Sequence, residues 1–238
     1  MGLLDDILGS ETLGNILGRG GSLVGSAGNA LSLVADIEDA KGDKANKTKV
    51  GNLGIAAGSL GGISSLMGFG KGYQDFWGSR KKLRELKAVD TDNMSEDEKA
   101  AHKKALEKAE NSKKGSIAGM IGGGAGLVSG IADIIGGMQK KKGGSGKAAG
   151  WVSNIAGLIG SGSGMAQGVY DYRAADSNKE KASAVNGIAG NAAGGLGGLL
   201  GLTGNILGEG KGDSWSMAGS VIGNGLGSLS NLIGTILG

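Results

Sequence analysis

The sequence contains no cysteine, no proline and only one histidine, and aromatic residues make up 3% of its 238 positions. Without cysteine it can form neither a disulfide nor a thiolate metal site. Collagen is excluded as well, because its triple helix needs proline and a glycine at every third position. Without a histidine pair or a cysteine, a catalytic triad is not expected, so we expect no enzyme, catalytic residue, cofactor or metal.

The start of the sequence lacks the pattern of a secretory signal. It reads MGLLDDILGSETLG, which is acidic where a signal peptide is basic. Asp6 stands where a myristoylation site has serine or threonine, so lipidation is not expected. We therefore expect any export to follow a route that needs no Sec signal peptide.

Glycine is the most abundant residue of the chain, with 53 of the 238 positions. This share is about three times the usual glycine content of about 7%. A flexible glycine linker would lack the leucine and isoleucine that recur throughout this sequence. Disorder driven by charge is also disfavoured, because the formal net charge is only +3. The composition therefore favours an ordered, glycine-rich structure.

Charged residues divide the chain into similar segments. The segments without charge are 50–70, 148–170, 182–208 and 214–238, while 115–139 carries only Asp133 and 12–35 is broken by Arg19. Their similar order of small and then aliphatic residues suggests a repeated unit of roughly 33 residues. We predict an N-terminal amphipathic helical segment at 1–49, a first glycine-zipper segment at 50–78 and a glycine-zipper repeat region at 115–238.

The remaining segment, 79–114, is rich in charge, and we interpret it as a solvated helical insertion or hairpin. Ser95 followed by Glu98 forms a capping box, which marks the start of a helix there. Glutamate and lysine pairs at neighbouring helical spacings support a helix in the residues that follow.

Many glycines lie four positions apart, a spacing that brings residues to one side of a helix. Such files would let two helix backbones approach closely. We predict helix-packing roles for Gly54, Gly58 and Gly62; Gly115, Gly119 and Gly123; Gly122, Gly126 and Gly130; Gly160, Gly164 and Gly168; Gly190, Gly194 and Gly198; and Gly219, Gly223 and Gly227. The predicted fold class is all-α, with antiparallel helical hairpins joined by short polar breaks.

The uncharged segments are long enough to cross a bilayer, which takes about 20 helical residues. Aromatic residues near the segment ends are candidates for the membrane interface: Trp77, Trp151, Trp215, Tyr73 and Tyr170. A mean hydropathy of −0.04 and several asparagines argue for weaker spans than those of a resident transporter. We therefore expect a chain that can convert from a soluble to an inserted state, with a permanently soluble helical array as the alternative.

At its four-residue glycine files the chain resembles the glycine-zipper pore-forming toxins that bacteria deliver through type VI or type VII secretion. The resemblance covers much of 50–70 and 115–238. It implies a secreted effector that depolarises a target-cell membrane, forms homo-oligomers and has an immunity protein or chaperone as partner. The alternatives are a phage or virion DNA-pilot protein that penetrates membranes, which alone would contact nucleic acid, and a soluble self-assembling array.

Overall fold

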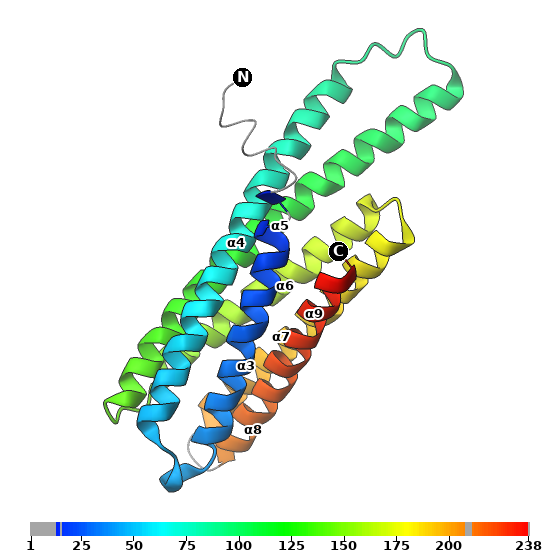
Figure 1. The fold of residues 1–238 in the computed structure, drawn as a ribbon. Helices are drawn as coiled ribbons and strands as arrows, with labels where there is room; N and C mark the ends of the chain where they lie inside the picture. Colours follow the sequence, from blue (N-terminus) through cyan, green and yellow to red (C-terminus); the bar gives the residue numbers. More distant parts are fainter. Residues whose placement is uncertain (1–12, 15, 208–210, 238) are drawn as a thin grey trace.

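The computed structural model describes residues 13–14, 16–207 and 211–237, and in these residues it is helical and contains no strand (Figure 1). The predicted all-α fold class is confirmed. The first residues of the predicted 1–49 segment lie outside the described part of the chain.

Six helical rods make up this part of the chain. In order, these are η1 with α3 (Ile16–Gly20 and Gly21–Asp39), α4 (Lys47–Lys87), α5 (Glu96–Lys141), α6 (Lys147–Ala174), α7 (Asn178–Leu207), and finally α8, η3 and α9 (Lys211–Ser220, Val221–Leu226 and Gly227–Leu237). Both η1 and η3 are π-helical stretches that continue directly into α-helix. A short 3₁₀ turn, η2 (Gly42–Lys44), precedes α4.

Local sequence signals account for where the helices begin and end. The capping box predicted at the start of α5 is present, since Ser95 accepts a hydrogen bond from the Glu98 amide and Glu98 accepts one from the Ser95 amide. The turn between α5 and α6 uses Gly143 and Gly146 at φ of +84° and +64°. A side chain is disfavoured in this left-handed region, so glycine fits both positions.

The rods pack as antiparallel neighbours and close into a ring. Each rod packs mainly on the one before it and the one after it, and α3 also packs on α9 and η3 at the other end of the chain. Figure 1 shows α3 lying between α4 and α9 in this arrangement. The interface between the first and last rods is therefore the one interface in the ring that no connecting loop spans.

The charged segment, predicted as a helical insertion or hairpin, is the projecting tip of a long hairpin. No helix boundary falls at 78/79 or 114/115, because α4 and α5 run on through the segment and only residues 88–95 between them are non-helical. Figure 1 shows this hairpin extending past the other helices. Lys108 on the hairpin pairs with Asp176 in the α6–α7 turn, and this contact lowers the pKa of Asp176.

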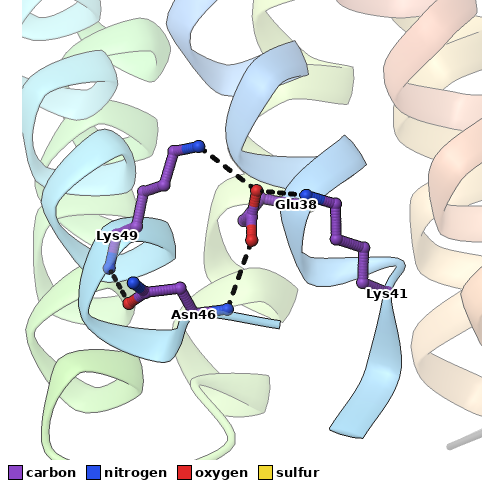
Figure 2. A network of polar contacts seen from close by, with 4 residues as sticks. All are labelled: Glu38, Lys41, Asn46 and Lys49. Atoms are coloured by element: carbon purple, nitrogen blue, oxygen red, sulfur yellow. Dashed lines mark hydrogen bonds and ion pairs between the residues drawn. The ribbon is translucent and has the colours of Figure 1, made fainter. Parts of the chain in front are cut away.

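A buried glutamate fixes the connection between α3 and α4 (Figure 2). Glu38 accepts hydrogen bonds from Lys41 Nζ at 2.7 Å, Lys49 Nζ at 3.3 Å and the Asn46 amide at 3.3 Å. Asn46 in turn caps α4 by accepting a hydrogen bond from the Lys49 amide at 3.0 Å. The hydrogen bond from Lys41, with those from Asn46 and Lys49, lowers the pKa of Glu38 to about 2.

Acidification should weaken this connection in a defined pH window. Because the pKa of Glu38 is lower in the folded protein than its ordinary value of 4.5, its contribution to stability is complete above 4.5 and declines as pH falls towards 2. We expect Glu38→Gln to abolish this part of the pH dependence. The measurement is the free energy of unfolding in detergent micelles between pH 6 and 2, in roughly half-unit steps, with the exposed Glu107→Gln as control. Parallel curves for the wild type and Glu38→Gln would contradict the assignment.

Candidate functional site: the interior of the helical ring

Glycine brings the backbones of α4 and α5 into direct contact. A Cβ atom at Gly58 would lie 2.7 Å from the carbonyl oxygen of Gly130, and one at Gly130 would lie 2.8 Å from that of Gly58. Gly51 and Gly137 face each other in the same way, at 2.6 and 2.7 Å. Real side chains do not approach so closely, so only glycine allows this separation. Dispersion and Cα–H···O contacts replace side-chain packing at such interfaces.

The interface repeats every seven residues. From one end to the other, α4 contributes Gly51, Gly58, Ser65 and Gly72, and α5 contributes Gly137, Gly130, Gly123 and Ser116. A second side of α5, about 100° around the helix, uses the adjacent positions against α6, namely Gly115, Gly122, Ser129 and Gly136. Two series of small residues, one position out of step, thus let α5 contact both of its neighbours closely.

The predicted four-residue glycine files are distributed over these interfaces. Gly54 and Gly58 face α5, whereas a Cβ atom at Gly62 would meet nothing within 4 Å, although the Gly62 backbone lies against Gly130 of α5. Each of the other files divides between two neighbouring helices. In the two files of α5, Gly115, Gly119 and Gly122 face α6, whereas Gly123, Gly126 and Gly130 face α4. In the later files, Gly160 faces α5 and Gly164 and Gly168 face α7; Gly190 faces α9 and Gly194 and Gly198 face α6; Gly219 and Gly223 face α7 and Gly227 faces α3.

Helix geometry explains why a file of this kind does not form one groove. Four residues turn a helix by about 40° more than one full turn, so three members of a file spread over about 80°. Seven residues fall only about 20° short of two turns, and a slight supercoil removes the difference. The series at positions seven apart therefore keeps facing one neighbour along the whole helix.

The interface that closes the ring is held by side-chain hydrogen bonds. Between α3 and the last rod, Ser220 bonds to Asp36, Asn224 Nδ2 to Ser32 Oγ at 3.2 Å, and Ser228 Oγ to the carbonyl of Ser26 at 3.4 Å. These contacts differ from the backbone contacts between α4 and α5, because amide and hydroxyl groups bridge the two helices.

The face of each helix that lies between its two interfaces points to the interior of the ring. On α4 this face carries Gly61, Gly68 and Asp75; on α5 it carries Asp133 and Lys140; on α6 it carries Gly157 and Asp171. The glycines at the edges of this face, Gly54, Gly119, Gly126, Gly150 and Gly164, contact a neighbouring helix as well. At Gly61, Gly68 and Gly157 a Cβ atom would meet no other atom within 4 Å, so there is open space in front of them. On these three rods the interior face thus carries glycine along the middle of α4 and α6 and charged residues towards its ends.

At one end of the ring, four charged groups from α3 and α5 share the interior. Lys140 Nζ lies 2.7 Å from Asp39 Oδ2, although α3 and α5 are separated in the ring by α4. Asp36 and Asp133 both lie within electrostatic range of Lys140, and Asp133 hydrogen-bonds to Ser153 of α6. These side chains come from three rods and meet at one mouth of the ring.

The other end contains a polar cavity of 390 Å³ between α4, α5 and α6. Its lining includes Asp75, Lys82, Lys108 and Asp171. Lys71 Nζ lies 2.5 Å from Asp75 Oδ2 at its edge. Both mouths of the ring therefore carry charges of both signs.

The outside of the ring is covered by large apolar side chains. Every rod contributes exposed residues of this kind, for example Ile16, Leu66, Ile131, Ile159, Leu199 and Ile236. The buried apolar residues of the described chain are mostly alanine, for example Ala57, Ala109, Ala132, Ala156 and Ala193. A protein stable in water places its large apolar residues inside, so this distribution is reversed.

The predicted interfacial aromatics lie at two levels along the ring. Trp151 and Trp215 are exposed near the mouth that contains Lys140, and Tyr73 and Trp77 are exposed towards the other mouth. Tyr170 is half-buried beside Gly115, level with Tyr73. About 20 helical residues separate the levels of Trp151 and Tyr73, which corresponds to about 30 Å.

Two helices of the described chain, α4 and α5, are long and apolar enough to cross a membrane. Only 11% and 17% of their most apolar stretches are buried inside the protein. A core helix of a soluble protein passes the same test of length and composition, but it is mostly buried. The exposure of α4 and α5 therefore separates them from helices of that kind.

Comparison with family models, with curated proteins and with solved structures yields no match. Among the residues that the structure describes, no three His, Asp or Glu side chains gather as a metal site would require. The contacts of Lys140 with Asp36 and Asp39 are not predictable from the local sequence pattern. One sequence signal does connect Lys140 with the glycines. Asp133 and Lys140 continue the seven-residue spacing of Gly119 and Gly126, so all four lie on one side of α5.

Proposed function

We propose that this protein inserts into a lipid bilayer and conducts ions through the interior of the ring. The observation that carries the proposal is the distribution of side chains: large apolar residues outside, small residues between the helices, and charged residues at the two ends of an interior that carries glycine on α4 and α6. In a bilayer, the outer side chains would contact lipid and the charges would lie at the aqueous mouths.

The dimensions of the ring support this function. The aromatic levels lie about 30 Å apart, the thickness of a hydrocarbon core, and such belts are typical of membrane interfaces. The charged hairpin tip projects beyond one belt, where it would be in water. The abundant glycine, which weakens a helix in water by about 1 kcal/mol per residue relative to alanine, is tolerated in lipid because an unpaired backbone costs more there.

The resemblance to secreted glycine-zipper toxins suggests the biological setting of this activity. In that setting the chain depolarises the membrane of a target cell, acts as a homo-oligomer and is neutralised in the producing cell by an immunity protein or chaperone. The exposed apolar surface agrees with a need for a chaperone before insertion, because such a surface would aggregate in water.

The test is permeabilisation of lipid vesicles by the purified chain. We expect release of a small entrapped dye and single-channel currents across a planar bilayer, with the lipids intact by mass spectrometry. Intact lipids separate a channel from a lipid hydrolase. An absence of both dye release and current over a range of lipid compositions and pH would refute the proposal and favour the soluble array.

A further inference from the structure

Lys140 occupies an unusual place for a lysine, because its ammonium group lies at the interior mouth of the ring and not on the outer surface. Its side chain extends from α5 to Asp39 of α3, past the intervening α4, and the Nζ to Oδ2 distance is 2.7 Å. The neighbouring Lys142, by contrast, is an exposed residue at the C-terminal cap of α5. The position of Lys140 is thus specific to this residue of the lysine run.

The groups that interact with Lys140 are acidic. Asp36, Asp39 and Asp133 are the carboxylates there, and Lys47 also binds Asp39, at 2.8 Å between Nζ and Oδ1. Ser220 and Ser153 hydrogen-bond to Asp36 and Asp133 and hold them in place. A ring of fixed charges at a pore mouth raises the local concentration of the opposite ion, so the sum of these charges affects which ions enter.

We propose that Lys140 is the residue that sets the ion selectivity of the pathway. Paired with Asp39 across the mouth, it limits the preference for cations that the three carboxylates would otherwise create, and it narrows the entrance. Removing its charge leaves Asp36 and Asp133 without this ammonium group and Asp39 paired with Lys47 alone, which shifts the mouth towards cation selectivity. This inference rests on the proposed channel function. It adds that the channel distinguishes small inorganic cations from anions.

The experiment measures the reversal potential of the full-length chain in a planar bilayer with a KCl gradient. Lys140→Gln should increase the permeability ratio of potassium to chloride severalfold, whereas Lys142→Gln, the matched control, should leave it unchanged. Asp39→Asn should shift the ratio in the opposite direction, because it removes one carboxylate and leaves the ammonium unpaired. The charge swap Asp39→Lys with Lys140→Asp keeps the sum of the charges at the mouth and should bring the ratio back towards the wild-type value.

Each outcome decides the inference. Equal reversal potentials for the wild type, Lys140→Gln and Lys142→Gln would overturn it while the channel function stands. If Lys140→Gln gives no channels, Asp39→Asn decides, and a ratio that stays the same or moves towards potassium overturns the inference. A lack of current in the wild type and in every variant refutes the channel function itself.

Discussion

Alanine at Gly58 should destabilise the protein, and alanine at Gly124 should stabilise it. Both glycines lie in helices, so alanine gains about 1 kcal/mol of helix propensity at each. At Gly58 the new methyl group would lie 2.7 Å from the Gly130 carbonyl oxygen and 2.9 Å from the Ile134 amide, and these backbone atoms cannot rotate away. We expect a net loss of about 1–3 kcal/mol there, the usual range for overpacking.

Leucine substitutions at the same positions test the effect of side-chain bulk on ion conduction. Gly58→Leu and Gly130→Leu should force α4 and α5 apart and abolish the current, because bulk decides the outcome at a backbone contact. Gly124→Leu should conduct normally, since a side chain there has nothing within 4 Å and lies on the exposed face of Ile121, Val128 and Ile131. The measurements are unfolding in detergent micelles by circular dichroism and bilayer current. A Gly58→Leu variant that keeps its helicity and conducts normally would refute close packing between α4 and α5.

A thiol placed at Gly157 should let a water-soluble reagent block the channel. The natural chain has no cysteine, so a single substitution introduces the only reactive thiol. Gly157 lies on the interior face of α6, and nothing within 4 Å opposes a side chain there. We expect Gly157→Cys to conduct until a charged thiosulfonate reagent is added from the aqueous phase, and then to lose nearly all of its current.

The matched control is Gly162→Cys on the same helix. Gly162 also has open space in front of it, but it lies on the outer face with the exposed residues Ile155, Ile159 and Val169. Its thiol would face lipid, which a charged reagent does not enter, so the current should persist. Block at both positions, or at neither, would contradict the assignment of Gly157 to the interior. Recovery of current with a reducing agent confirms that the effect is the thiol modification.

The fold class could be predicted from sequence because the signals for helices are local. The capping box of Ser95 and Glu98, the polar breaks and the absence of proline are each read within a few residues. The charged segment was also recognised as helical. A hairpin was one of the two expectations for it. That the hairpin projects beyond its neighbours could not be inferred, because the sequence near 79 and 114 contains no stop signal and the extra length only appears relative to the shorter neighbouring helices.

The sequence identifies residues small enough for close helix packing, but it does not identify the helices that they contact. Glycine files such as Gly115, Gly119 and Gly123 mark helix surfaces without side chains, and each of these residues does contact another helix. A file that turns by about 40° per step faces two neighbours in succession, and which two depends on how the helices are arranged around the ring.

The sequence by itself determined that this chain is helical, where its helices can begin and end, and which residues are small enough for backbones to meet. Only the tertiary structure decided that the first and last helices meet, since this contact joins residues such as Ser26 and Ser228 that no local pattern connects. Closing the ring gives each helix two neighbours, and the remaining faces then become an interior and an exterior. That division places Lys140 beside Asp39 and the large aliphatic residues on the outside, because a side chain's surroundings depend on its neighbours as well as on its own helix.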